Sequence, residues 1–337
     1  MRFAALLLLA ASTAFAEPVT LNGAGATFPY PLYSKWSSDY QKVEPDVRIN
    51  YQSIGSGGGI RQITQRTVDF GASDGPMNDE QLAKAPGILH LPTVMGAVVV
   101  TYNLAGVDKP LTLSGPVVAD LFLGKITRWN APEIAKLNPG VSLPAQDVLV
   151  VHRSDGSGTT YQFVDYLAKI SPEWEKKVGR STSVAWPVGL GGKGNEGVAG
   201  TLKQTPGALG YVELVYAAQS KLPAARLVNA SGRTVDASVE SVTAAAAGVK
   251  LPDDLRTSIT NSPNAAAYPI AGFTYLLAYK DQPDAAKGTA LTKFIWWAVH
   301  DGQKTAPGLT YAPLPDDVRA KVEAKLKSIT SGGKAIL

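Results

Sequence analysis

Strand-like and helix-like hydrophobic patterns alternate along almost the whole chain, and this alternation limits the possible folds more than any other feature. Residues 47–52 alternate between apolar and polar side chains, as a half-exposed strand does. Residues 94–102 and 147–151 are apolar almost throughout, which is typical of buried strands. Apolar residues at spacings of three and four predict helices over four segments, residues 29–41, 160–170, 284–300 and 316–328. The chain is therefore predicted to be an α/β protein, with helices layered on sheets.

Three predicted strand-to-helix junctions are rich in glycine and in hydroxyl side chains. They cover residues 23–29, 53–59 and 153–160. A helix start leaves backbone amides free to donate and carries the positive end of the helix dipole, so it attracts anions. Any one of these junctions is also compatible with an ordinary helix N-cap. Three of them in one chain, one with Arg153 beside it, favour a site for an oxyanion.

Other motifs give weaker signals. Residues 189–194 match G-x-G-x-x-G, but Pro187 comes just before them and they lie late in the chain, so dinucleotide binding is poorly supported. Ser157 does not fit a nucleophile elbow, because Asp155 stands where that motif has a glycine. The histidines are too scattered to suggest a metal cluster: His90, His152 and His300. The sequence predicts no catalytic group, no metal site and no cofactor.

Composition excludes further classes of protein. The sequence has no cysteine, so it can form no disulfide, thiolate zinc site, iron–sulfur cluster or lipid-anchored N-terminal cysteine. Its formal net charge is only +4, and no dense run of lysine and arginine is present. We therefore expect no nucleic-acid partner.

The first 16 residues have the features of a secretory signal peptide. Arg2 provides positive charge, residues 3–10 are apolar, and Ala14-Phe15-Ala16 fits the small-x-small pattern of a cleavage site. The apolar stretch is too short for a membrane helix, which needs about 20 residues. We expect cleavage before Glu17 and a soluble, periplasmic mature protein.

Several long motifs resemble one family. LNGAGATFPYPLYSKW, INYQSIGSGGGIRQI, TVDFGASDGPM and VHRSDGSGTTYQFVDYLAK, followed by WPVGLGGKGNEGVA and PGALGYVE, resemble the periplasmic phosphate-binding proteins of ABC-type phosphate uptake. The resemblance extends from about residue 19 to the C-terminal helix. It implies two α/β lobes joined by a hinge, with a dehydrated phosphate held in the cleft between them. The implied lobes are residues 17–93 with 269–337, and residues 94–268, with crossings near 94–102 and 268–279.

The resemblance also implies a set of phosphate-binding residues. Asp74 would be the lone carboxylate facing the anion, Arg153 would supply charged donors, and Asp155 would hold Arg153 and partly neutralise it. Amides and hydroxyls at the helix starts would supply the other donors: Thr27, Phe28, Ser56, Ser157, Gly158 and Thr159.

The sequence departs from the family pattern at two positions that are not among these residues. Gly57 stands where a serine is common, and His152 stands where a basic residue is common. The implied function is capture of inorganic phosphate by a monomer that delivers it to the membrane permease subunits of an ABC importer. A secreted phosphohydrolase on the same scaffold is the alternative.

Overall fold

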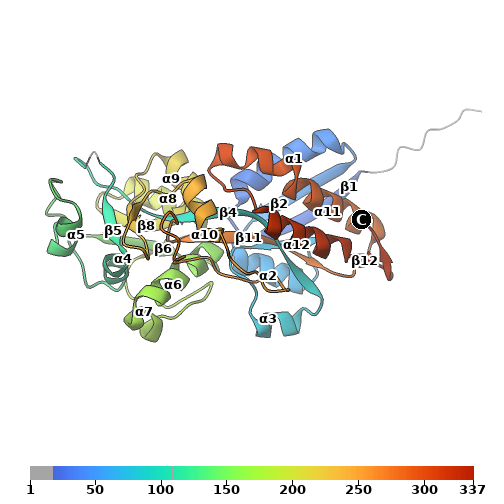
Figure 1. Ribbon diagram of the computed structural model, residues 1–337, viewed down its shortest axis with the longest axis horizontal. Coiled ribbons are helices and arrows are strands. Elements are labelled where there is room, and N and C mark those ends of the chain that lie inside the picture. Colours follow the sequence, from blue (N-terminus) through green and yellow to red (C-terminus); the bar gives the residue numbers. More distant parts are fainter. Residues whose placement is uncertain (1–17, 108) are drawn as a thin grey trace, which may run out of the picture.

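Two long strands connect the two halves of the molecule, which lie side by side along its longest axis in Figure 1. The computed structural model describes residues 18–107 and 109–337, so the predicted signal peptide lies outside the described residues. Strands β4 (Ile88–Tyr102) and β11 (Ala271–Tyr279) are antiparallel to each other, and almost every residue in them is buried. Residues 88–97 of β4 pair with β11, and residues 98–102 pair with β8 (Ala208–Glu213). One strand is therefore shared by both lobes.

The first lobe is built on three parallel strands covered by helices. Strand β1 (Val19–Gly25) lies between β2 (Val47–Ser53) and β3 (Phe70–Ser73), and β3 pairs with β11. The helices of this lobe come from both ends of the chain: α1 (Tyr30–Val43), α2 (Ser56–Thr64), α3 (Asp79–Lys84), α11 (Ala285–Val299) and α12 (Asp316–Lys327). Two short 3-10 helices, η1 (Asp301–Thr305) and η2 (Pro307–Leu309), and the hairpin of β12 (Thr330–Ser331) and β13 (Lys334–Ala335) complete it.

The second lobe is formed by the middle of the chain and also consists of parallel strands covered by helices. Strand β6 (Leu149–Arg153) pairs in parallel with β7 (Leu190–Gly192) and with β8, which joins them to β4. A small sheet holds β5 (Thr112–Ser114), β9 (Arg226–Val228) and β10 (Thr234–Val235). The helices are α4 (Gly115–Phe122), α5 (Pro132–Leu137), α6 (Gly158–Ile170), α7 (Pro172–Lys177), α8 (Gly194–Gln204), α9 (Leu214–Ser220) and α10 (Val239–Ala246).

The local patterns behave as predicted. Helix α1 buries Leu32, Tyr33, Trp36 and Tyr40, which recur at spacings of three and four, and β2 alternates between half-buried and exposed residues. The predicted helices over 160–170, 284–300 and 316–328 correspond to α6, α11 and α12. The predicted strand 147–151 begins two residues later, because Asp147 and Val148 pair with the loop at Thr127 and Arg128 instead. The predicted two-lobed α/β architecture is confirmed.

Candidate functional site

The three predicted junctions meet between the lobes, because parallel strands bring their carboxyl ends to one edge of a sheet. In the first lobe, Gly25 at the end of β1 is in register with Ser53 of β2 and with Ala72 of β3. In the second lobe, Arg153 at the end of β6 is in register with Gly192 of β7. The helices that follow, α1, α2 and α6, therefore begin at the same interlobe surface.

Asp74 follows β3 directly and is almost completely buried, with 2% of its surface exposed. Burial raises the pKa of its carboxyl group from an ordinary value of 3.8 to about 7, against the opposing effects of the Thr274 hydroxyl, the Arg153 charge and the Ser56 hydroxyl. The Thr274 hydroxyl donates to Asp74 Oδ1 over 2.8 Å. Thr274 lies on β11, 200 residues away in sequence, and was not among the predicted site residues. Its only local signal is that it is a polar residue within an apolar strand.

Ser56 connects the two lobes at the start of α2. Its Oγ accepts from the backbone N–H of Gly158, at the start of α6, over 3.0 Å, and from the backbone N–H of Asp74 over 3.3 Å. The same Oγ lies 3.5 Å from Asp74 Oδ2. The Gly158 amide, which the resemblance implied as a phosphate donor, therefore donates within the protein in this closed arrangement.

Glycine at two positions makes this approach of the lobes possible. A Cβ on Gly158 would lie 2.6 Å from the Cβ and N of Asp74 and from Ser56 Oγ. Gly55 has a φ of +87°, and a Cβ there would lie 2.3 Å from Asp155 Oδ2. Larger residues at either position would keep the two helix starts apart.

Arg153 and Asp155 form a bidentate ion pair on the second lobe. Arg153 Nε donates to Asp155 Oδ1 over 2.8 Å, and Nη2 donates to Oδ2 over 2.6 Å. The amide of Gly194, at the start of α8, also donates to Asp155 Oδ1, over 3.0 Å. Burial opposes ionisation of Asp155, but its bonds with Arg153 hold the pKa of this carboxyl below its usual range. The pair fixes the guanidinium in one orientation and offsets its charge.

Thr27, Thr159 and Asn195 form a buried cluster that crosses between the lobes. Asn195 Nδ2 donates to Thr27 Oγ1 over 2.7 Å and to Thr159 Oγ1 over 3.1 Å. Arg153 Nη1 lies 3.4 Å from Thr159 Oγ1. Asn195 was also missed as a site residue, although it follows the glycine-rich segment 189–194, which contains β7 and the first residue of α8. That segment is a fourth glycine-rich strand-to-helix junction, and it lacks the hydroxyl side chains of the other three.

Four buried backbone amides at these helix starts have no acceptor in the described part of the chain: those of Thr27, Phe28, Ser56 and Thr159. Ser157 differs from them, because its amide donates to the Thr182 carbonyl over 2.8 Å and its Oγ caps α6 by accepting from the Thr160 amide over 3.0 Å. Burying a backbone amide without an acceptor lowers the free energy of unfolding, and an anion is a suitable acceptor for the amides at a helix start. The nine predicted residues thus lie at one interlobe surface dominated by donors.

A second buried carboxyl group, that of Glu213, lies at the end of β8 behind this surface. Burial raises its pKa well above the usual range, which favours its neutral form. A cavity of about 210 Å³ lies beside the cluster, lined from both lobes by Thr27, Ser53, Ile54, Asp155, Lys193, Gly194 and Glu196.

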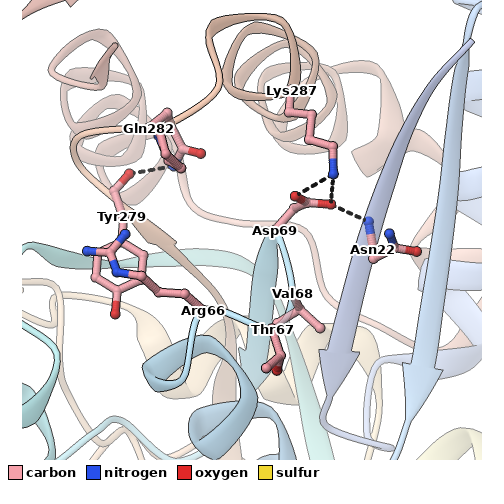
Figure 2. Close-up of a pocket in the computed structure, with 9 residues that line it drawn as sticks. Asn22, Arg66, Thr67, Val68, Asp69, Tyr279, Gln282 and Lys287 are labelled. Carbon is pink, nitrogen blue, oxygen red and sulfur yellow. Dashed lines mark hydrogen bonds and ion pairs between the residues drawn. The ribbon is translucent and has the colours of Figure 1, made fainter. Parts of the chain in front are cut away.

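A different cavity, drawn in Figure 2, lies away from these residues. Its volume is about 230 Å³, and none of the nine predicted site residues lines it. Its cationic groups already have partners, since Lys287 Nζ lies 3.0 Å from Asp69 Oδ1 and the Arg66 guanidinium lies 3.6 Å from the centre of the Tyr279 ring. The described residues of this cavity offer no comparable set of free donors.

Comparison with known proteins places the chain in a family. A family model described as a PBP superfamily domain matches residues 11–301. The phosphate-binding protein PstS of Xylella fastidiosa (strain 9a5c) is 48% identical over 311 residues, which cover 91% of this chain and 85% of that protein. The chain belongs to the PstS family of phosphate-binding proteins.

Other members of the PstS family are similar over comparable lengths. The phosphate-binding protein PstS of Pasteurella multocida (strain Pm70) is 44% identical over 342 residues, which cover 98% of each chain. Among solved structures, a high-affinity periplasmic phosphate-binding protein called PfluDING, bound with phosphate at pH 8.5, matches with a TM-score of 0.74. That match has 23% identity and covers 91% of this chain and 93% of the other, so it supports the fold alone.

No helix within residues 18–107 and 109–337 is long and apolar enough to cross a bilayer. In the same residues, no group of three or more His, Asp or Glu side chains could hold a metal ion.

Proposed function

We propose that this chain captures inorganic phosphate between its two lobes and delivers it to the permease subunits of an ABC importer. The phosphate ligands are the residues named from the sequence: Thr27, Phe28, Ser56, Asp74, Arg153, Ser157, Gly158 and Thr159. Asp155 holds Arg153 in place. Membership of the PstS family supports this function, because the relatives that match most of the chain carry the name phosphate-binding protein.

One observation carries the proposal. Four buried amides at three helix starts, drawn from both lobes, lack an acceptor within the described residues, and the guanidinium of Arg153, held by Asp155, belongs to the same interlobe surface. An oxyanion satisfies such donors through several oxygens at once, and each bond is strengthened by the low local dielectric. The Gly158 amide joins this set if phosphate replaces Ser56 Oγ as its acceptor.

Asp74 gives the site its selectivity. Phosphate near neutral pH keeps at least one proton, whereas sulfate keeps none. A carboxylate can accept a hydrogen bond from a protonated oxygen, but it repels an oxygen without a proton. A site with a buried group that requires a donor rejects an analogue lacking that donor by roughly 10⁴–10⁵.

The interlobe contacts support capture by closure. Ser56 with Gly158 and Thr27 with Asn195 join helix starts on opposite lobes. We place one lobe boundary at 93/94, near the point in β4 where its pairing changes from β11 to β8, and the other at 268/269, just before β11 begins. The mature protein would be a periplasmic monomer, exported by the signal peptide over residues 1–16 and beginning at Glu17.

Competition against labelled phosphate tests the proposal. Purified mature protein at neutral pH should bind phosphate, arsenate should displace it, and sulfate should not displace it even in large excess. X-ray scattering should give a smaller radius of gyration with phosphate than without. Absence of phosphate binding would refute the function, and equal displacement by sulfate would refute the role of Asp74. Turnover of an aryl phosphate by the pure protein would favour the phosphohydrolase instead.

A further inference from the structure

Asn195 holds a central position that the proposed function does not use. Its side chain is completely buried in the first turn of α8. Nδ2 donates to the hydroxyl oxygen of Thr27, which precedes α1 in the first lobe, and to that of Thr159, in the first turn of α6 in the second lobe. One amide therefore joins hydroxyl groups from both lobes.

The orientation of this amide is fixed. Asn195 Oδ1 accepts from the backbone N–H of Glu213 over 2.9 Å. A backbone N–H can only donate, so the oxygen of Asn195 must face Glu213 and its NH₂ group must face the two threonines. Turning the amide over would set its NH₂ group against the Glu213 N–H, and the threonine hydroxyls would then have to donate to Asn195 Oδ1.

The hydrogen bonds to each threonine leave only one role for its hydroxyl proton. Thr27 Oγ1 also accepts from the backbone N–H of Asn195, over 3.2 Å, and Thr159 Oγ1 also lies 3.4 Å from Arg153 Nη1. A hydroxyl group has two lone pairs and one proton. With both lone pairs directed at donors, the proton of each hydroxyl is available only for donation to a further acceptor.

We propose that Asn195 is a positioning residue that makes the Thr27 and Thr159 hydroxyls obligate donors to the bound anion. This inference rests on the proposed phosphate-binding function. Because Asn195 reaches Thr27 across the lobes, the Thr27 hydroxyl is set as a donor only when the lobes are closed. When the lobes close on the anion, the site therefore has two oriented hydroxyl donors, and these carry no positive charge.

A double-mutant cycle tests whether Asn195 acts through the two hydroxyls. Asn195→Ala alone should weaken phosphate binding by about tenfold, as the loss of one or two oriented hydrogen bonds does. In a protein that already carries Thr27→Val and Thr159→Val, the same substitution should change the affinity less than about twofold, because no hydroxyl is left to orient. Phosphate affinities would be measured by isothermal titration, and thermal unfolding without phosphate would report on folding.

Asn138 provides a matched control. It is a buried asparagine of the second lobe whose Nδ2 donates to the carbonyls of Thr112 and Ile134, away from the site. Asn138→Ala should lower the thermal stability and leave the phosphate affinity unchanged. If the protein with both valines does not fold, Thr27→Val alone should still reduce the effect of Asn195→Ala, whereas Thr27→Ser, which keeps the hydroxyl, should preserve it.

The possible results separate this inference from the proposed function. Wild-type protein that binds no phosphate would refute both. Wild-type protein that binds phosphate, with Asn195→Ala costing the same factor with and without the threonine hydroxyls, would refute only the role of Asn195. Loss of affinity in Asn138→Ala equal to that in Asn195→Ala would also refute it, because the effect would then be one of general packing.

Discussion

The two lobes contribute unlike halves of the candidate site. On the first lobe, Asp74 is a buried carboxyl group whose pKa burial raises to about 7, and the hydroxyl groups of Thr274 and Ser56 lie against its two oxygens. On the second lobe, Arg153 is a buried guanidinium with two hydrogen bonds to Asp155. The charge of the second half is fixed and balanced by its partner, whereas the charge of the first half depends on one proton.

From this difference we expect the two halves of the site to have different roles in anion binding. The second half attracts and orients an anion, because its donors are held in place before binding. The first half selects among anions, because the ionised carboxylate of Asp74 can accept a proton of the ligand but has no donor for an unprotonated oxygen. Changes in the second half should therefore affect affinity most, and changes in Asp74 should affect selectivity and pH dependence.

Removing the guanidinium should have the largest effect. Arg153→Ala deletes the charged donors and leaves Asp155 facing the anion without its partner, so phosphate affinity should fall on the order of 10²–10³-fold. Isothermal titration would measure this. Arg128→Ala is the control, because this exposed arginine of the same lobe pairs with Asp147 at 3.5 Å, far from the predicted residues in sequence, and its loss should leave affinity unchanged. An Arg153→Ala affinity within threefold of wild type would mean that the site lies elsewhere.

The ionisation of Asp74 should make stability depend on pH. With a folded pKa of about 7 against an ordinary 3.8, the folded protein binds more protons than the unfolded chain between about pH 4 and pH 7. The free energy of unfolding contributed by Asp74 should therefore fall as pH rises through this window, by at most about 4 kcal/mol.

Comparison with Asp74→Asn isolates this contribution. Urea unfolding without phosphate should show the variant gaining stability relative to wild type from pH 4 to pH 7, with a constant difference above pH 7. Asn138→Ala, which removes no titratable group, should lower the free energy of unfolding by the same amount at every pH in this range. A constant difference between Asp74→Asn and wild type across the whole range would show that Asp74 does not titrate in this window.

The sequence predicts the local parts of the site better than the contacts across it. The alternating patterns and the glycine-rich helix starts follow from local periodicity, and so do α1, α6 and α11. Thr274 could not be found in this way, because it meets Asp74 only after β11 returns to pair with β3. Asn195 had a local signal, the glycine-rich turn before a helix, but its partner Thr27 lies 168 residues earlier. The discontinuous lobe boundary rested on family resemblance and not on any pattern in the residues.

Closure should be sensitive to a single methyl group at the contact between the halves. Gly158→Ala would place a Cβ 2.6 Å from three atoms of the first lobe, two of which belong to the Asp74 backbone and Cβ. Overpacking of this kind costs about 1–3 kcal/mol, so phosphate affinity should fall roughly 10- to 100-fold. The phosphate-induced decrease in radius of gyration should also shrink.

Gly200 offers the matched control for that substitution. It lies within α8, and a Cβ there would meet no atom within 4 Å. Gly200→Ala should raise stability by about 0.5–1 kcal/mol through helix propensity and leave affinity unchanged. Equal affinities for Gly158→Ala and wild type would indicate that phosphate binding does not require the closed contact.

The smallest expected change in phosphate affinity, and the most specific, comes from Asp74→Asn. The amide keeps an acceptor oxygen for the proton of phosphate but adds a donor, so phosphate affinity should fall by about tenfold, less than after Arg153→Ala. Sulfate, which the carboxylate repels, should gain affinity because the amide N–H can donate to an unprotonated oxygen. Competition against labelled phosphate at neutral pH should therefore show a narrower gap between phosphate and sulfate in the variant than in wild type. Arsenate should continue to compete in both proteins, since it has the shape and protonation of phosphate. If Asp74→Asn rejects sulfate as strongly as wild type does, selection must come from the second half of the site, and the division between the halves is wrong.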